Sequence, residues 1–362
     1  KTTVTRWLAQ ALNHLGKKAA VIGTLGYGKP DELKAHTGLT TPDVVGVHHL
    51  LHELRQDGFE TVCIEASSIG LEQRRLACVS IDVALFTNLS QDHLDYHGDM
   101  AAYGRSKMIL ASWPTLRLAV VNGDDSFGME FLANVQRRNI DCSAVGRADS
   151  AECQILSVAH QENGQRIELK INGASTQIDT PMIGEFNADN MALVFATLIR
   201  LGYEVSEVKS ALAGVTPAPG RMQHIEGEPA VVVDYAHTPD ALEKTLLALR
   251  PFANKRQGKL WVVFGCGGDR DRSKRPLMGA AAADKADFVV VTSDNPRSEK
   301  PENILQEIVD GIDKARQDKL HVEVDRVRAI EFAVAKASAK DVVLLAGKGH
   351  ESTQTIGTQV IA

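Results

Sequence analysis

The chain of 362 residues is 44% hydrophobic, which is enough apolar material for two or three buried cores. Its 40 basic and 46 acidic residues leave a net charge of −6, so the composition excludes the basic surface that nucleic acids or anionic membranes require. Small polar substrates fit this charge better than nucleic acids or anionic membranes do.

Helices and short apolar strands alternate through the first part of the chain. Apolar side chains recur with helical spacing from position 4 to 15, and Gly16 follows as a stop. A second helix is predicted from Thr41-Pro42-Asp43, a cap residue followed by proline, to Gly58. Parallel strands that are buried on both faces read as short apolar runs, and such runs occur at 61–64, 83–87 and 118–121. This alternation predicts an α/β fold.

The pattern changes between about 153 and 180, where apolar and polar residues alternate strictly at Ile167, Leu169 and Ile171. Asn163-Gly164 and Asn172-Gly173 are typical hairpin turns, so we predict a small antiparallel sheet here. Helices are predicted at 187–201 and 205–212, and then comes "TPAPGR", whose prolines and glycine suit a domain linker. We expect the domain boundary near residue 222.

Beyond the linker, strands are predicted at 231, 260, 288 and 342, with helical segments between them. This order predicts a doubly wound, Rossmann-like sheet. We therefore predict two domains: residues 1–222, with a parallel sheet plus the small antiparallel sheet, and residues 223–362, with the Rossmann-like sheet.

Cysteine usage and the absence of long apolar runs indicate a cytoplasmic protein. The cysteines form no CxxC pair and no disulfide-like spacing, and they stand at positions 63, 78, 142, 153 and 266. No apolar run approaches the roughly 20 residues that span a bilayer, so we expect no membrane insertion. Because the chain begins with Lys1 and not with methionine, we expect a fragment whose upstream residues are missing.

Polar residues gather directly after the predicted strands. Open parallel sheets bind ligands beyond the carboxyl ends of their strands, so these residues are the candidates for a site. The stretches are "IEASS", "TNLSQDHLDYHGD", "FGCGGDRD", "SDNPRSE" and "LAGKGHE". Each alone has an ordinary interpretation as a turn or a helix cap. Their coincidence at strand ends favours a site, since glycines let backbone approach a ligand and charged neighbours can bind the carboxylate and ammonium of an amino acid.

Two groups of residues suggest phosphate and metal chemistry. Lys1-Thr2-Thr3 matches the tail of the phosphate-binding loop GxxxxGK[ST], although three residues alone favour an ordinary helix start. Glu65 and His93 could coordinate a magnesium ion whose other ligands are water and phosphate oxygens. Histidine is an unusual magnesium ligand, so a capping or hydrogen-bonding role for His93 is an equal alternative.

Taken in order, these motifs closely resemble the Mur ligase family, and within it the MurE type. They are "KTT", "EASSIGLEQRR", "TNLSQDHLDYHGDMAAYGRSK", "PGRM", "VDYAHTPDAL", "FGCGGDRDRSKRPLMG", "SDNPR" and "GKGHE", and they span nearly the whole chain. The resemblance implies a peptidoglycan-synthesis enzyme that uses ATP and Mg²⁺ to add meso-diaminopimelate to UDP-N-acetylmuramoyl-L-alanyl-D-glutamate through an acyl phosphate. It also implies that residues 1–222 are a P-loop central ATP-binding domain and residues 223–362 the C-terminal domain.

The resemblance assigns roles to single residues around ATP. Lys1, Thr2 and Thr3 would hold its phosphates, with Thr2 and Glu65 at a first magnesium and His93 at a second. Lys107 would be a carbamate and thereby a metal ligand, whereas the sequence alone favours an ordinary helix-surface lysine. The residues near the base, ribose and phosphates of ATP would be Asn187, Arg221, Asp234, Tyr235 and His237. The residues implied as catalytic are Lys1, Glu65, His93, Lys107 and Arg221.

Two further sets follow from the resemblance. The muramoyl dipeptide would be held by Thr40, Thr41, Ser67, Gln73 and Arg75, whose alternative role is helix capping and a solvated turn. The incoming amino acid would be held by Arg270, Asp294, Asn295, Pro296, Arg297, Gly347 and Glu351. The planar fork of Arg297 can bind a carboxylate with two hydrogen bonds, and diaminopimelate carries a second carboxylate that lysine lacks.

Alternatives remain at this stage. The same reaction with L-lysine, or a sibling ligase of the folylpolyglutamate type, is the nearest, and Arg297 argues against both. A P-loop ATPase that only switches conformation would hydrolyse ATP without an acceptor amine, and a scaffold without turnover is disfavoured by the density of polar strand ends. The family's UDP-binding domain, the P-loop glycines and the end of the last domain are missing, so we expect activity to belong to a parent protein, which we expect to be a monomer.

Overall fold

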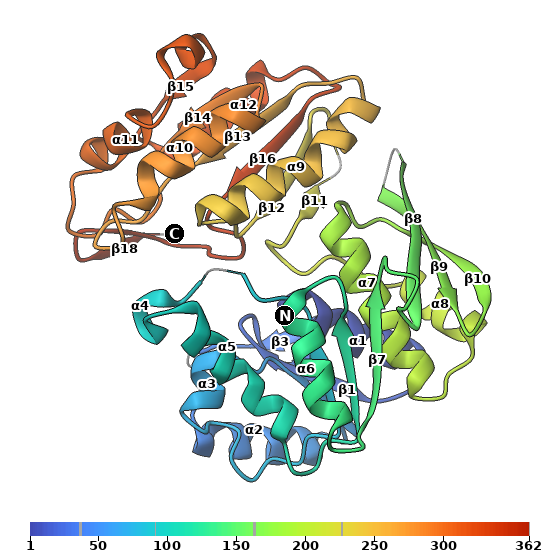
Figure 1. The fold of residues 1–362 in the computed structure, drawn as a ribbon. Coiled ribbons are helices and arrows are strands. Elements are labelled where there is room, and N and C mark those ends of the chain that lie inside the picture. Colours follow the sequence, from blue (N-terminus) through green and yellow to red (C-terminus); the bar gives the residue numbers. More distant parts are fainter. Residues whose placement is uncertain (36–37, 91, 162–163, 226, 362) are drawn as a thin grey trace. The chain divides into compact units, whose positions relative to one another are not determined.

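The chain folds into two compact units, seen here in a computed structural model that describes residues 1–35, 38–90, 92–161, 164–225 and 227–361 (Figure 1). Unit 1 comprises residues 1–159, 166–180 and 186–216. Unit 2 comprises residues 160–165, 181–185 and 217–362. Within the described residues, no helix is both long and apolar enough to cross a membrane.

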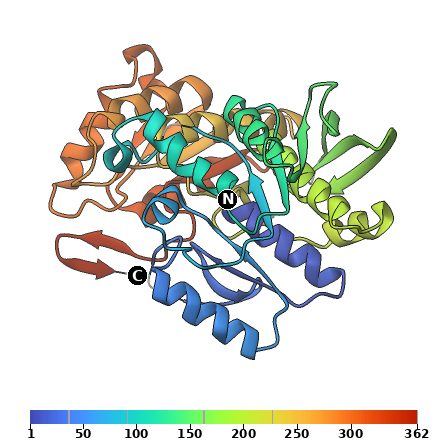
Figure 2. The same cartoon turned by 60° about the horizontal axis from the view of Figure 1, so that its bottom comes forward.

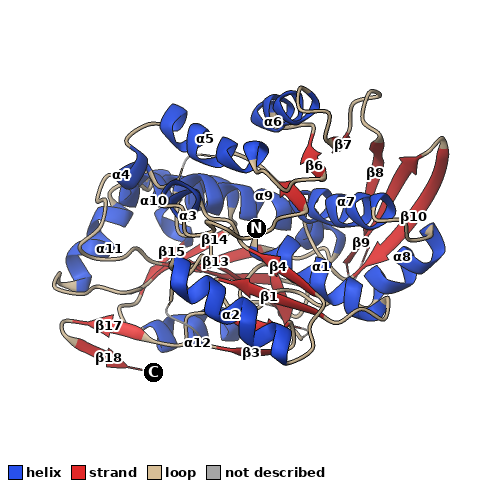
Figure 3. Ribbon diagram, turned by 90° about the horizontal axis from the view of Figure 1, so that it is seen from below, coloured by secondary structure: helices blue, strands red, loops and turns tan. Residues whose placement is uncertain are grey.

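A first sheet in unit 1 has the strand order β3-β2-β1-β4. Its elements and the helices beside it are α1 (Thr2–His14), β1 (Ala19–Gly23), β2 (Gly26–Lys29), β3 (Glu32–Lys34), α2 (Val44–Gln56), β4 (Thr61–Ile64) and α3 (Ser68–Glu72). Strand β1 pairs in parallel with β4 and antiparallel with β2. Leu50 and Leu54 of α2 pack on Ala20 and Ile22 of β1, so α2 covers one face of this sheet (Figure 3).

A second sheet in unit 1 has the strand order β10-β9-β8-β7-β6-β5. Its strands are β5 (Val83–Phe86), β6 (Leu118–Asn122), β7 (Asp141–Gly146), β8 (Cys153–Gln161), β9 (Gly164–Ile171) and β10 (Ala174–Thr180). The intervening and following helices are α4 (Leu94–His97), α5 (Met100–Met108), the 3-10 helix η1 (Ile109–Ser112), α6 (Ser126–Gln136), α7 (Glu185–Arg200) and α8 (Val205–Ala213). Strands β5, β6 and β7 are parallel neighbours.

The residues of the predicted small antiparallel sheet extend this second sheet. Strand β8 joins β7 through a short parallel pairing, in which Val145 stands opposite Cys153. Only Asn172 and Gly173 connect β9 to β10, and a two-residue connection joins antiparallel neighbours. Both have positive φ, 50° and 79°, as a type I′ turn requires, so this predicted turn is confirmed. The other predicted turn depends on Asn163, which lies outside the described residues.

The expectation that the strands at 61–64, 83–87 and 118–121 are all buried on both faces is wrong for the first two. In β6, Leu118 to Val121 are buried, whereas only Cys63 is buried in β4 and only two residues are buried in β5. The reason is their place, since β4 and β5 each lie at an edge of their sheet. An edge strand is covered by fewer neighbours than a central one.

Unit 2 contains the doubly wound sheet, with strand order β11-β12-β16-β13-β14-β15. The strands are β11 (Gln223–Ile225), β12 (Ala230–Asp234), β13 (Leu260–Phe264), β14 (Phe288–Val291), β15 (Leu320–Val322) and β16 (Val342–Ala346). From β12 to β15 every neighbouring pair is parallel. The helices are α9 (Pro239–Lys255), α10 (Lys274–Lys285), α11 (Pro301–Val309), the 3-10 helix η2 (Lys314–Lys319) and α12 (Arg326–Lys336). A separate hairpin of β17 (Gln354–Ile356) and β18 (Gln359–Ile361) follows, drawn in red in Figure 2.

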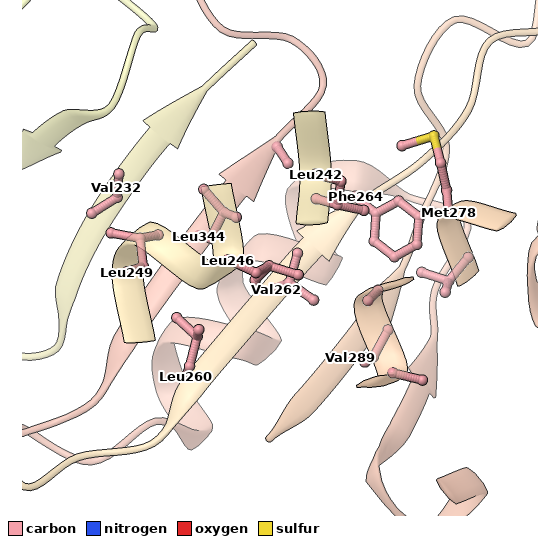
Figure 4. Packing of buried hydrophobic residues seen from close by; sticks show 14 of the residues in the cluster. Val232, Leu242, Leu246, Leu249, Leu260, Val262, Phe264, Met278, Val289 and Leu344 are labelled. Carbon is pink, nitrogen blue, oxygen red and sulfur yellow. The ribbon is translucent and has the colours of Figure 1, made fainter. Parts of the chain in front are cut away.

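Both faces of the sheet in unit 2 are covered. Val262 and Phe264 of β13 face Leu246 of α9 and Met278 of α10 in one apolar cluster (Figure 4). The intervening residues Trp261 and Val263 belong to a second cluster, which includes Ala329 and Ala333 of α12. Side chains of a strand alternate between faces, so a run without polar residues indicates helices on both sides. The predicted Rossmann-like arrangement is confirmed.

A buried guanidinium joins two loops at one end of this sheet. Arg275 of α10 is fully buried and donates to both carboxylate oxygens of Glu299, at 2.8 and 2.9 Å, to Glu307 at 2.9 Å, and to the carbonyl of Gly267 at 3.2 Å. Glu299 also accepts from the backbone N–H of Asp269 at 2.7 Å. The loop after β13 and the loop after β14 therefore share one buried ion pair, and their positions are linked.

Replacing Arg275 with methionine should lower the free energy of unfolding of unit 2 by roughly 3–5 kcal/mol, because two carboxylates lose a buried partner. The hydrogen bonds from Arg275 hold the pKa of Glu299 at about 2, below its ordinary 4.5. This pair therefore stabilises the fold fully above pH 4.5 and progressively less as the pH falls toward 2. Chemical denaturation at a series of pH values from 4.5 to 2 measures this effect. The free energy of unfolding should fall less steeply with decreasing pH in Arg275→Met than in the unsubstituted protein.

The matched control is Arg272→Met. Arg272 pairs with Glu307, but its side chain is 66% exposed, so the expected loss is below about 1 kcal/mol. Equal losses in the two variants, or an unchanged pH dependence in Arg275→Met, would contradict the linking role of Arg275.

Candidate functional site

The carboxylate of Glu65 lies at the carboxyl end of β4 and receives hydrogen bonds from two other elements. Thr2 Oγ1, in the first turn of α1, donates at 2.9 Å, and the backbone N–H of Thr24, just after β1, donates at 2.9 Å. Gly23 makes this possible, because a Cβ at that position would lie 2.2 Å from Glu65 Oε1. Glu65 and Thr2 are both buried.

These residues fit a magnesium ion. Mg²⁺ takes oxygen ligands and is usually held by one or two protein groups, with water and phosphate supplying the rest. Thr2 and Glu65 offer a hydroxyl and a carboxylate side by side, and Lys1 comes immediately before Thr2 at the start of α1. Thr3 lies half-buried in the same first turn. In the described ranges, no three His, Cys, Asp or Glu side chains form a group that could hold a metal by themselves.

His93 lies at the start of α4 in a left-handed backbone conformation, with φ of 54°. Its Nε2 is 3.5 Å from the carboxylate of its neighbour Asp92, and its backbone N–H donates to the same carboxylate at 2.8 Å. These contacts are those of the hydrogen-bonding alternative. A role for His93 as a metal ligand stays a prediction.

Lys107 is not the helix-surface lysine that the sequence alone favours. Its Nζ donates to the carbonyl of Asn88 at 3.3 Å and lies 4.9 Å from the ring centroid of Tyr103 and 5.7 Å from that of Phe86. Burial, together with the charge of Lys1, lowers the pKa of Lys107 from 10.5 to about 7. This shift favours the neutral amine, which is the form that reacts with CO₂.

The five residues predicted to hold the dipeptide lie together, next to Glu65. Thr41 Oγ1 donates to the carbonyl of Glu65 at 2.6 Å and accepts from the backbone N–H of Ser67 at 3.0 Å. Arg75 donates to the carbonyl of Thr41 at 2.8 Å and to Gln73 Oε1 at 2.9 Å. Two further contacts complete the group: Ser67 caps α3, as the alternative interpretation expected, and Thr40 Oγ1 is 3.1 Å from Thr24 Oγ1.

The candidates for the nucleotide base are divided between the units. Asn187 is buried in the first turns of α7, in unit 1. In unit 2, the Arg221 guanidinium lies 4.3 Å from the ring centroid of Tyr235, and His237 Nδ1 is 2.9 Å from the carbonyl of Tyr235. Arg221 therefore lies over the Tyr235 ring, and His237 meets the same ring edge to face, with centroids 4.8 Å apart and planes at 69°.

Asp234 organises the backbone around this group. Its carboxylate accepts from the N–H of Met222 and from the N–H of Ala236, each at 2.8 Å, and burial raises its pKa. Because both oxygens are engaged, the structure favours a positioning role for Asp234. Gly220, just before Arg221, has φ of 64°, and a Cβ there would lie 2.1 Å from the carbonyl carbon of Gly349. The linker and the "GKGHE" loop thus touch backbone to backbone.

The predicted amino-acid pocket contains a polar cluster from two loops. Asn295 Nδ2 donates to Glu351 at 3.2 Å, and Asn295 Oδ1 accepts from Lys348 at 3.1 Å. Asp294 is buried, and its Oδ1 lies 3.4 Å from Lys348 Nζ. Gly347, with φ of 106°, brings its backbone close to Asp294. The residues after β14 and after β16 therefore meet in one place.

Arg297 is fixed by its backbone and by one side of its guanidinium. It has φ of 50°, its N–H donates to Thr355 at 3.1 Å, and its carbonyl accepts from Gly357 at 2.7 Å. Nη1 donates to the carbonyl of Gly268 at 2.7 Å, while Nε and Nη2 have no partner among the described residues. Pro296 is buried beside it, and the predicted Arg270 is exposed on the loop after β13. Part of the Arg297 fork is thus available to a ligand.

Two cations of this pocket were missed at the sequence level. Lys348 belongs to the "GKGHE" motif but has no role implied by the resemblance, yet it contacts Asp294, Asn295 and Glu351. Arg326 begins α12 and donates to the carbonyls of Ser293, at 3.3 Å, and Ala346, at 2.9 Å. Arg326 follows the short strand β15, which was not predicted from the sequence. With that strand predicted, Arg326 would have been a candidate, because site residues are expected just after the ends of parallel strands.

Comparisons with known proteins agree with this architecture. Residues 1–198 match the family described as the Mur ligase middle domain, and residues 220–349 match the Mur ligase, glutamate ligase domain. A curated relative from Acidovorax sp. (strain JS42) is 46% identical over 99% of this chain and 73% of its own length. One from Neisseria meningitidis serogroup B (strain MC58) is 45% identical over 98% and 72%. Both are named UDP-N-acetylmuramoyl-L-alanyl-D-glutamate--2,6-diaminopimelate ligase.

Solved structures give the same result. A structure with that same ligase name is 38% identical, covers 99% of this chain and 73% of its own, and has a TM-score of 0.72. The folylpolyglutamate synthase of Mycobacterium tuberculosis, complexed with ADP, has a TM-score of 0.72 over 96% of this chain and 85% of its own, at 21% identity. At that identity the second likeness concerns the fold alone.

Replacing Lys1 with methionine should raise the pKa of Lys107, because a neighbouring positive charge is removed. Burial is the larger cause, so the pKa should stay below the ordinary 10.5. An NMR titration of ¹³C-methylated lysines in CO₂-free buffer measures it. The control Lys18→Met, at an exposed position of unit 1, should leave the titration of Lys107 unchanged. A value near 10.5 in the unsubstituted protein would contradict this account of the site.

Proposed function

The chain belongs to the Mur ligase family, and on this premise we propose that it is the ATP-dependent ligase that adds meso-diaminopimelate to UDP-N-acetylmuramoyl-L-alanyl-D-glutamate in peptidoglycan synthesis. The observation that carries the proposal is the 44–46% identity, over nearly the whole chain, to curated relatives named for this reaction. We further propose a cytoplasmic monomer. The cysteines 63, 78, 142, 153 and 266 are free thiols, which supports a reducing compartment.

The reaction joins a carboxylate to an amine in two steps. The side-chain carboxylate of the D-glutamyl residue attacks the γ-phosphorus of ATP, and ADP leaves, which gives an acyl phosphate. The neutral amine of diaminopimelate then attacks the acyl carbon, inorganic phosphate leaves, and the amine loses a proton as the amide forms. Catalysis of phosphoryl transfer is largely positioning and charge stabilisation. Lys1 and the N-terminal N–H groups of α1 would supply these for the phosphates.

Thr2 and Glu65 would hold Mg²⁺, which when bound neutralises charge on the phosphates. Glu65 is well placed for this because hydrogen bonds from Thr2 and Thr24 already fix its carboxylate. The chain thus holds its acidic group in one orientation before any nucleotide arrives, which lowers the cost of ordering it on binding.

Lys107 would carry the carbamate. Its neutral Nζ attacks the carbon of CO₂, a C–N bond forms, one C–O π bond opens to an anionic oxygen, and the proton leaves to solvent. The product is a carboxylate in place of an ammonium, so the residue becomes an oxygen ligand. Burial of Lys107 and the nearby charge of Lys1 support this role, because both disfavour the ammonium form.

Selection of the amino acid would rest on unit 2. The available side of the Arg297 fork suits the second carboxylate of diaminopimelate, and Asp294 and Glu351 suit its ammonium groups. Lysine has no second carboxylate, so it would leave the guanidinium unpaired. A pocket binds a substrate much more weakly when that substrate leaves a polar group of the pocket unpaired, so it discriminates strongly against such a substrate.

An acceptor screen on the full-length parent protein with the muramoyl dipeptide and ATP tests the proposed function. We expect phosphate release that depends on diaminopimelate and is much slower with lysine or glutamate. Faster ligation of lysine would make the protein a lysine-adding ligase. ATP hydrolysis that needs no acceptor amine would instead support a nucleotide-driven switch.

Replacing Arg297 with alanine should lower kcat/KM for diaminopimelate about 100-fold, because a charged hydrogen-bonding partner is lost. KM for ATP should stay within about two-fold, since discrimination acts on the amino acid alone. Steady-state kinetics with each substrate varied in turn measure both. Arg328→Ala, at an exposed position of α12, serves as the control. Equal losses for ATP and diaminopimelate would show that Arg297 is structural.

A further inference from the structure

A histidine outside the proposed roles lies in the interior of unit 1. The side chain of His97, at the end of α4, is only 1% exposed. Its Nδ1 is 3.1 Å from Glu72 Oε2, and its Nε2 is 2.9 Å from Ser68 Oγ. When Nδ1–H donates to the carboxylate, Nε2 is free to accept from the serine hydroxyl, so one neutral tautomer satisfies both bonds. Both partners belong to α3.

The same histidine contacts helix α5. Its ring stacks on Tyr103, with centroids 5.2 Å apart and planes at 24°. Ser106 donates to Glu72 at 3.0 Å, so α5 also reaches the histidine's carboxylate partner. On the same helix, Lys107 Nζ lies 4.9 Å from the centroid of Tyr103. His97 is therefore bonded to α3 and packed against the residue that forms a wall of the Lys107 site.

The serine, histidine and glutamate are spaced as in a nucleophilic triad, with one base between two partners. A nucleophile must be reachable by its substrate. Ser68 is 1% exposed, so that interpretation is excluded. The cluster must act through the elements that it holds.

Helix α3 depends on such outside contacts. It has five residues, and a helix that short is not stable by its own hydrogen bonds. Its ends carry residues proposed to hold the dipeptide: Ser67 is its cap, Gln73 follows its last residue, and Arg75 comes two residues later. A small shift of α3 would displace all of them together.

We propose that His97 is a positioning residue, which fixes helix α3 against helix α5 and thereby sets the dipeptide-holding residues relative to Lys107. This inference rests on the proposed function. It concerns a residue that would touch neither ATP nor the dipeptide. Replacing His97 should therefore change the kinetics of the muramoyl dipeptide and not those of ATP.

The test is His97→Phe in the full-length parent protein, which keeps an aromatic ring for Tyr103 and removes both hydrogen bonds. We expect KM for the muramoyl dipeptide to rise about 10-fold or more, as loss of two hydrogen bonds allows, with KM for ATP within two-fold. His97→Gln, whose amide can both donate and accept, should recover most of the loss. His52→Phe, an exposed histidine of α2, should behave as the unsubstituted protein.

Ser68→Ala provides a second variant that removes one bond and leaves the ring in place. It should raise KM for the dipeptide by less than His97→Phe and leave KM for ATP unchanged. Parallel increases for both substrates, or unchanged kinetics in His97→Phe and Ser68→Ala, would overturn the proposal. If the unsubstituted protein does not use the dipeptide at all, the proposed function fails instead, so the two failures are distinct.

Discussion

The buried carboxylate of Glu65 is the constraint around which the candidate site of unit 1 is built. A buried charge is costly unless hydrogen-bond donors surround it, and these donors come from the start of α1 and from the residue after β1. The backbone carbonyl of the same residue holds Thr41, and Thr41 in turn holds Ser67 and Arg75. The start of α1, proposed to bind phosphate, and the segment proposed to hold the dipeptide are thus fixed to one residue at the end of β4.

Unit 2 applies the same principle with a cation. Arg275 is fully buried and satisfies Glu299, Glu307 and a backbone carbonyl at once. The two loops that it links, after β13 and after β14, carry residues that would select the amino acid, so this ion pair supports that pocket. Arg297 itself is held through backbone contacts, which leave part of its fork available. Rigid support from residues that touch no ligand is what a selective polar pocket requires.

Much of the fold follows from local patterns. The apolar runs at 61–64 and 288–291 became β4 and β14, and the Asn172-Gly173 turn formed because both residues tolerate positive φ. Strand β1 was not predicted although it is a short, fully buried apolar run, whereas β2 and β3 were not predicted because the hairpin residues 26–34 are rich in glycine and charge and show no alternation. The environment of Lys107 could not be predicted from the local sequence either, because its contacts Phe86 and Asn88 lie on a strand and on a loop. Arg275 and Arg326 gained their roles only through tertiary contacts.

The contact between Gly220 and Gly349 restricts which side chains these two positions can accept. Two loops, far apart in sequence, lie so close that neither position has room for a side chain unless a backbone moves. Any residue introduced at 220 would push the loop that carries Lys348 and Glu351. If that loop selects the amino acid as proposed, a substitution at 220 would alter amino-acid preference, and a genetic screen for specificity mutants would recover changes at this position together with changes in the pocket.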